Sequence, residues 1–110
     1  MAHDEDLADR LRALLAGERG ITEKRMFGGQ AFLLGGHLLV AASGKGGLLA
    51  RIDPDDAEAA LARPGAAPMV MRGRPLVGWL RVEPDAVRTK RDLSAWVKRS
   101  LSFVRGLPPK

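Results

Sequence analysis

Hydrophobic residues at the start of the chain repeat with the period of an amphipathic helix. The apolar stripe consists of Leu7, Leu11, Leu14 and Leu15. This i, i+4, i+7, i+8 spacing places all four side chains on one face of a helix. Residues 4–6 are acidic and favour the positive end of the helix dipole, and Gly17 suits the other end. The pattern predicts a helix over residues 4–16.

Between residues 24 and 52 the apolar residues form short runs separated by glycines. The runs are Met26-Phe27, Ala31–Leu34, His37–Ala42 and Leu48–Ile52. Runs of this length between glycine pairs predict antiparallel strands joined by tight turns. Gly35-Gly36 fits a two-residue hairpin turn, because both central positions of a type I′ turn need positive φ. A flexible glycine-rich loop is the alternative, and the apolar residues between the pairs argue against it.

A second helix and two further strands follow. Asp53 as the N-cap and Pro54 at the first helical position predict a helix over residues 54–62. Arg63-Pro64-Gly65 would end it. The next apolar runs predict strands over residues 68–72 and 77–82, connected by residues 73–75.

The last element is predicted to be a helix that begins near Arg91. Thr89 or Asp85 is its expected cap. Its predicted inner face consists of Leu93, Trp96, Val97, Ser100 and Val104. The helix should fade at residues 106–109, where glycine and two prolines occur.

The order of elements predicts an α+β fold with two layers, an antiparallel sheet and helices packed on it. That order is one helix, three or four strands, a helix, two strands and a final helix. No linker, repeat or low-complexity tract interrupts residues 1–110, so we expect one domain. The residues expected to share one core between sheet and helices are Met26, Phe27, Phe32, Leu39 and Trp96.

Several separated motifs carry a family resemblance. They are Arg25-Met26-Phe27-Gly28-Gly29 before an apolar hairpin, Leu48–Ala62, Pro68-Met69 with Gly73-Arg74-Pro75 and Gly78-Trp79, and Ala95-Trp96 with Leu107-Pro108-Pro109. Together, over about residues 5–110, they resemble the N-terminal domain of the TfoX family. The resemblance implies a regulator related to those that promote transcription of DNA-uptake genes in natural competence. It implies no catalytic residues, and we expect a stand-alone member without the C-terminal domain of the full regulators.

Charge is divided unevenly along the chain. Residues 1–62 contain 7 Lys/Arg and 10 Asp/Glu, whereas residues 63–110 contain 11 Lys/Arg and 3 Asp/Glu. A basic C-terminal part can attract an acidic protein, nucleic acid or the acidic part of a second copy, and it can also be only a solvated face. Arg91, Lys98 and Arg105 are seven residues apart and would line one side of the last helix. The predicted partner-binding residues are Arg88, Arg91, Lys98, Arg99 and Arg105.

The candidate chemical motifs favour structural explanations. Gly28-Gly29-Gln30 matches a tripeptide of peptide-chain release factors, but it leads directly into a predicted strand. Gly44–Gly47 encloses a lysine, yet a strand follows where a phosphate-binding loop needs a helix. The chain has no cysteine and two histidines, and no cluster has metal-ligand spacing.

We therefore expect a protein-binding module, with no cofactor, no bound metal and no enzymatic activity. The acidic N-terminus lacks the positive charge of a signal peptide, so a cytoplasmic location without a membrane partner is expected. Self-association is a further possibility. Weak nucleic-acid binding by the last helix and an undetected enzyme are the alternatives. Trp79 and Trp96 are expected in the core, which argues against base stacking on exposed aromatics.

Overall fold

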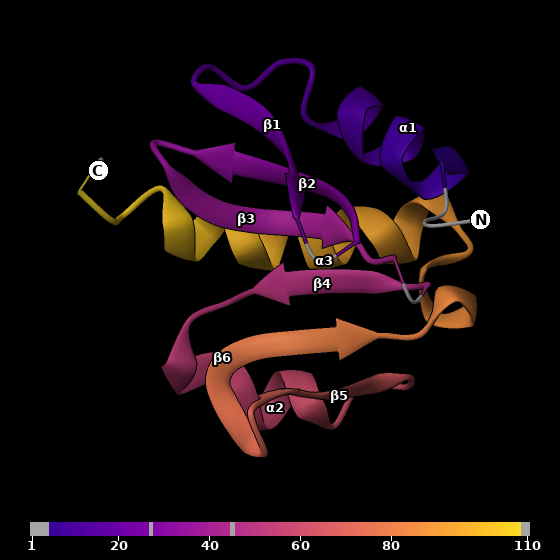
Figure 1. Ribbon diagram of the computed structural model, residues 1–110, viewed down its shortest axis with the longest axis vertical. Helices are drawn as coiled ribbons and strands as arrows, with labels where there is room; N and C mark the ends of the chain where they lie inside the picture. Colours follow the sequence, from indigo (N-terminus) through magenta and orange to yellow (C-terminus); the bar gives the residue numbers. More distant parts are fainter. Residues whose placement is uncertain (1–4, 27, 45, 109–110) are drawn as a thin grey trace.

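The computed structural model describes residues 5–26, 28–44 and 46–108, and it has the predicted α+β fold (Figure 1). A six-stranded antiparallel sheet has the strand order β1-β2-β3-β4-β6-β5, and the helices pack on one of its faces. The helices are α1 (Glu5–Leu14), α2 (Ala57–Leu61) and α3 (Lys90–Val104). The strands are β1 (Ile21–Met26), β2 (Gly29–Leu34), β3 (His37–Ala42), β4 (Leu48–Arg51), β5 (Ala66–Met71) and β6 (Arg74–Val82).

The main core lies between the sheet and the helices. Phe32, Leu39 and Trp96 belong to it, as predicted. The whole predicted inner face of α3 is buried, and Leu101 joins it. Burying apolar surface here is the main force that holds the three helices on the sheet.

A second, smaller core occupies the opposite face of the sheet. Its buried residues are Ala31, Leu33, Leu38, Ala41, Leu49 and Met69, with Met26 and Trp79 packed against them. The prediction that Met26 shares the helix-side core is therefore wrong, because its position in β1 directs it to the other face. Phe27 lies outside the described residues. The register of β2 with β3 shifts between Phe32 and Leu33, and such a bulge increases the local bend of a sheet.

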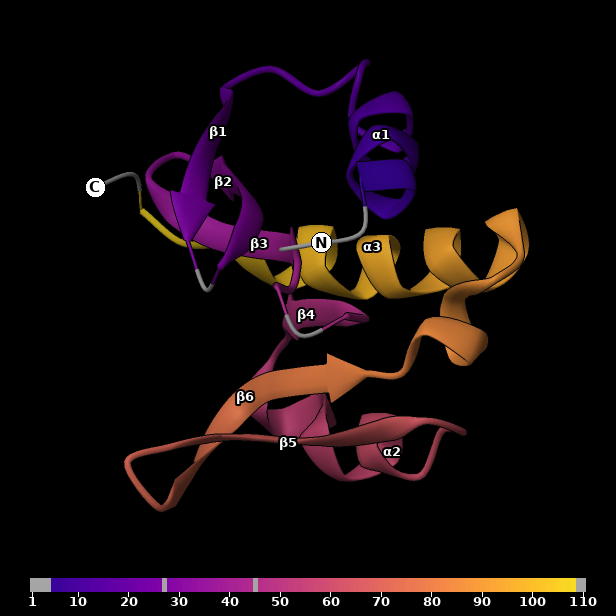
Figure 2. The same ribbon diagram turned by 45° about the vertical axis from the view of Figure 1, so that its right-hand side comes forward.

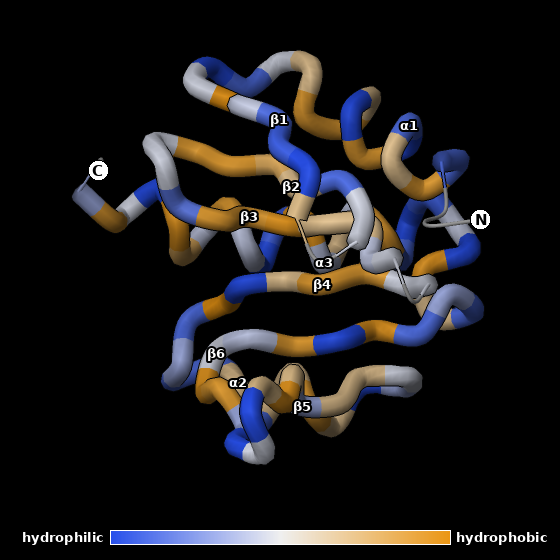
Figure 3. The backbone as a smooth tube through the Cα atoms, in the orientation of Figure 1, coloured by the Kyte–Doolittle hydropathy of each residue, from blue (hydrophilic) through white to orange (hydrophobic). Residues whose placement is uncertain are grey.

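The first strand begins earlier than its sequence pattern indicates. Residues 22–25 of β1 are all exposed, and β1 is an edge strand that pairs only with β2. Figure 3 shows β1 mostly in hydrophilic colours and β2 and β3 mostly in hydrophobic ones. An edge strand with few buried side chains lacks the apolar alternation by which strands are recognised in a sequence.

Turn and cap residues act largely as predicted. Gly35 and Gly36 have φ of 60° and 86°, as a type I′ turn between β2 and β3 requires. The Asp53 carboxylate accepts a hydrogen bond from the Asp55 amide at 2.9 Å. A short 3-10 helix over Pro54–Asp56 then precedes α2, so the predicted helix 54–62 is shorter in its α-helical part.

The structure decides which residue caps α3 and where the β5–β6 turn lies. Thr89 is the N-cap of α3, since its hydroxyl accepts from the Asp92 amide at 3.1 Å. The β5–β6 turn consists of Arg72 and Gly73, because Met71 pairs with Arg74. The predicted connection over residues 73–75 is therefore wrong in position.

Candidate partner-binding surfaces

The predicted basic stripe lies on the outer side of α3. Arg91, Lys98 and Arg105 are all exposed, and the apolar residues of α3 face the sheet. Trp96 on the inner side keeps only 5% of its surface accessible, so it offers no ring to a nucleic-acid base.

Three of the five predicted residues already have acidic partners within the chain. Arg88 pairs with Asp85 at 2.9 Å, and Arg99 pairs with Asp56 at 2.8 Å. Arg105 donates to Glu18 on the segment after α1. The Arg99 guanidinium also stacks 5.6 Å from the ring centre of Trp96. The pairs of Arg99 and Arg105 hold α3 to its neighbours, and all three pairs neutralise part of the predicted positive charge.

Arg91 and Lys98 differ from the other three. Neither has an ion pair or hydrogen bond to another part of the chain that the structure describes. Lys98 stands between two shallow hollows, one beside Asp53 and Phe103 and the other beside Leu14 and Glu18. The outer side of α3 is thus a ridge that carries Arg91 and Lys98, flanked by surfaces of mixed polarity, and Lys90 is a further exposed cation at the start of the helix.

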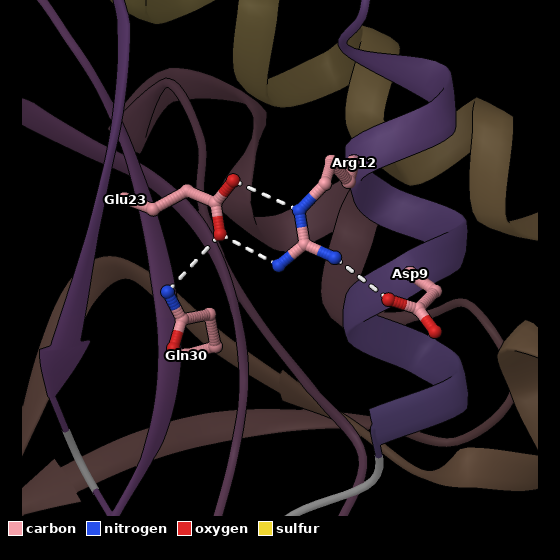
Figure 4. Close-up of polar contacts among 4 residues, drawn as sticks. All are labelled: Asp9, Arg12, Glu23 and Gln30. Atoms are coloured by element: carbon pink, nitrogen blue, oxygen red, sulfur yellow. Dashed lines mark hydrogen bonds and ion pairs between the residues drawn. The ribbon is translucent and has the colours of Figure 1, made fainter.

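A four-residue polar network joins α1 to the edge strand β1 (Figure 4). Arg12 donates to both Glu23 carboxylate oxygens, at 2.9 and 2.7 Å, and to Asp9 at 2.6 Å. The Gln30 amide donates to the same Glu23 carboxylate at 3.1 Å. Gln30 is thereby part of β2 and of this network, which does not fit the exposed loop of a release factor.

The charges of the network favour a structural role, in which the Arg12–Glu23 pair holds α1 to β1. Hydrogen bonds from Arg12 are the main reason that the pKa of Glu23 is lowered, and Glu23 in turn raises the pKa of Arg12. The Arg12 guanidinium also lies 5.9 Å from the Phe32 ring centre. A general acid near neutral pH needs a raised carboxyl pKa, so the direction found for Glu23 favours a structural role.

A second cation, Arg51 at the end of β4, lies near two aromatic rings and His37. Its guanidinium lies 5.1 Å from the ring centre of Trp79 and 5.5 Å from that of Phe103. His37 Nε2 is 2.7 Å from the Pro108 carbonyl oxygen, and Nδ1 is 3.4 Å from an Arg51 nitrogen. A carbonyl can only accept, so Nε2 carries the proton and Nδ1 accepts from Arg51. The cluster fastens the chain after α3 to the sheet.

The glycine motifs form one end of the sheet. Gly28 has φ of 71° and lies in the β1–β2 turn, as the prediction of an unusual backbone requires. Gly46 and Gly47 shape the loop between β3 and β4, whereas Lys45 lies outside the described residues. Arg25 is exposed on β1. Within the described ranges, no group of His, Cys, Asp and Glu could hold a metal ion.

The sequence analysis predicted the two strands of the β5–β6 hairpin but did not identify the hairpin as a candidate surface. The large apolar side chains that are exposed in the described part of the chain, Val70, Val77 and Met71, all lie on it. Residues 59–82 contain four arginines and no Asp or Glu. The absence of acidic residues from this stretch was a signal in the sequence for a basic surface. The pattern of apolar and polar residues did not show that the apolar side chains are exposed.

Comparison with known proteins agrees with the motifs. Neither the curated proteins nor the solved structures provide a match. No helix within the described residues is long and apolar enough to span a membrane. Residues 13–104 match the TfoX N-terminal domain, a stretch that includes the glycine turn, both tryptophans and the whole of α3. The chain therefore belongs to the TfoX N-terminal domain family.

Proposed function

We propose that this protein is a cytoplasmic regulatory module that acts by binding another protein, and that it carries out no catalysis. Membership of the TfoX N-terminal domain family supports a role in competence-related regulation. The observation that carries the proposal is the pair of exposed, uncommitted cations Arg91 and Lys98 on α3. Their partner in this proposal is an acidic protein surface.

The packing of α3 supports its use as a binding surface. Its inner face is buried along the whole helix, and Thr89 caps its N-terminus. The ion pairs of Arg99 and Arg105 attach it to two other segments. A rigid helix loses little conformational entropy on binding, so the attraction of Arg91 and Lys98 for carboxylates is retained as affinity.

The test compares charge reversal on α3 with a matched reversal elsewhere. The double variant Arg91→Glu/Lys98→Glu should keep the thermal midpoint, because neither side chain has an internal partner. It should lose capture of the acidic partner from the native cytoplasm. The control Lys24→Glu/Arg25→Glu changes the net charge equally, on exposed positions of β1, and should retain capture.

Two outcomes would replace the proposal. Equal capture by both double variants would mean that the α3 ridge is only solvated surface. Binding to duplex DNA that falls steeply with salt, and is lost in the α3 variant, would assign the ridge to phosphates. Sedimentation of the protein alone tests self-association, in which Arg91 and Lys98 would contact the acidic part of a second copy.

A further inference from the structure

The β5–β6 hairpin combines exposed apolar and cationic side chains at its tip. Val77 is 71% exposed, Val70 59% and Met71 42%. Arg72 and Arg74 lie between them in the sequence, and both are exposed. These three are the exposed large apolar side chains among the described residues, and all of them lie on this hairpin. Arginine and methionine are also enriched at protein interfaces.

The tip projects beyond the rest of the sheet. β4 pairs with β6 only from Trp79 to Val82, so residues 74–78 of β6 have no strand neighbour on the β4 side. Figure 2 shows the turn of this hairpin reaching away from α1 and α3. Side chains on both faces of the tip are therefore open to a partner.

The hairpin is unsuited to extending the sheet of a partner. Met71 and Arg74 flank a two-residue turn and so form its first hydrogen-bonded pair. The next pair, Val70 and Pro75, then directs its backbone groups outward, and Pro75 has no amide to donate. Pro68 likewise has no amide to donate from β5. Two amide donors that a partner strand would need are therefore missing from the hairpin, which favours recognition by side chains.

The backbone of Arg72 indicates that its side chain matters. Its φ of 54° is the only positive value at a non-glycine position among the described residues. A type I′ turn prefers asparagine or glycine at this position, and the Gly35-Gly36 turn of the same chain follows that rule. An arginine there lowers stability relative to asparagine, which is consistent with a role for the guanidinium outside the fold.

We propose that the tip of the β5–β6 hairpin, residues 70–77, binds an acidic segment of another protein that also carries apolar side chains. Val70 and Val77 would be buried against the apolar side chains, and Arg72 and Arg74 would pair with the carboxylates. The exposed apolar area favours a protein over nucleic acid, whose interfaces are more polar and more densely basic. Like charges disfavour pairing with the same hairpin of a second copy, because residues 59–82 contain no acid.

Binding is tested with defined probes on the full protein. The probes are a short peptide of alternating Glu and Leu, the corresponding Lys and Leu peptide, an all-Glu peptide and a short DNA duplex. The Glu–Leu peptide should bind best. The amide chemical shifts of the protein that change on binding should be those of residues 70–77. The double variants Arg72→Glu/Arg74→Glu and Val70→Ser/Val77→Ser should each lower the affinity for the Glu–Leu peptide roughly tenfold or more. Lys24→Glu/Arg25→Glu and Arg91→Glu/Lys98→Glu should bind it as the wild type does.

One substitution separates a binding role from a structural one. Arg72→Asn relieves the backbone strain of the turn, so it should raise the thermal midpoint of the protein. It should also weaken binding of the Glu–Leu peptide. Opposite signs on stability and binding are not expected of a residue that serves only the fold.

Four results would overturn the proposal. They are equal binding by the hairpin variants, shift changes that fall on α3, tighter binding of the DNA duplex at the hairpin, and hairpin-dependent self-association. The proposal does not rest on the α3 surface, and failure of either leaves the other standing.

Discussion

Replacing Gly29 with alanine tests a close approach of the backbone of β3 and the following loop to β2. A Cβ added at Gly29 would lie 1.8 Å from the Ala42 carbonyl oxygen, 2.9 Å from its carbon and 3.0 Å from the Gly44 amide nitrogen. All three atoms belong to the backbone of β3 and the loop that follows it. They cannot rotate away as a flexible side chain would, so β2 and β3 must separate at this end.

The expected loss of stability in Gly29→Ala follows from the contacts that are lost when β2 and β3 separate. Overpacking a tight contact costs about 1–3 kcal/mol. Loss of a sheet hydrogen bond beside it adds about 1 kcal/mol. We therefore expect Gly29→Ala to lower the free energy of unfolding by about 2–4 kcal/mol. A domain of this size has roughly 5–15 kcal/mol in total, so the effect is large.

Two glycines of the same chain provide controls for denaturant and thermal unfolding. Gly28→Ala meets only the Gly44 Cα at 3.5 Å but needs a φ of +71°, so it should cost about 1 kcal/mol or slightly more. A Cβ at Gly17 meets nothing within 4 Å, and Gly17→Ala should be nearly neutral. If Gly29→Ala cost no more than Gly28→Ala, the close approach of β2 to β3 would be refuted.

Three other predictions concern the buried residues Trp96 and Ser100 and the Arg12–Glu23 pair. Trp96→Ala should lower the free energy of unfolding by about 3–5 kcal/mol in chemical denaturation, and a loss below about 1 kcal/mol would contradict its burial. Ser100 Oγ is buried without a hydrogen-bond partner among the described residues, so Ser100→Ala should be neutral or stabilising by up to about 1 kcal/mol, and a clear loss would reveal a hidden partner. The lowered pKa of Glu23 means that its carboxylate stabilises the fold above its unfolded pKa, and that this contribution is lost as pH falls through the folded pKa. Glu23→Gln should therefore lower the thermal midpoint at neutral pH, and the difference should vanish in acid; a difference independent of pH would exclude the Arg12 pair as its source.

Local rules in the sequence were sufficient for most of the elements. Helical spacing placed α1 and the inner face of α3, and glycine pairs placed the β2–β3 turn. These features depend on contacts or dihedral angles within a few residues. The edge strand β1 was recognised only in part, because the burial that produces a readable pattern is missing there.

The candidate surfaces show the same division. Periodicity along α3 was enough to place Arg91, Lys98 and Arg105 on its exposed side. It could not show that Arg105 meets Glu18 or that Arg99 meets Asp56, because those partners are far apart in the sequence. Which cations remain uncommitted is therefore a property of the folded chain.

The sequence by itself determined the fold class, the β2–β3 turn, the Asp53 cap and the family, since short-range spacing and backbone preferences carry that information. The tertiary structure alone decided three further points. It directed Met26 to the second core, brought the Ala42 carbonyl against Gly29, and left the β5–β6 tip beyond the sheet. Each of these depends on strand register and sheet curvature, which arise only when distant segments pack together.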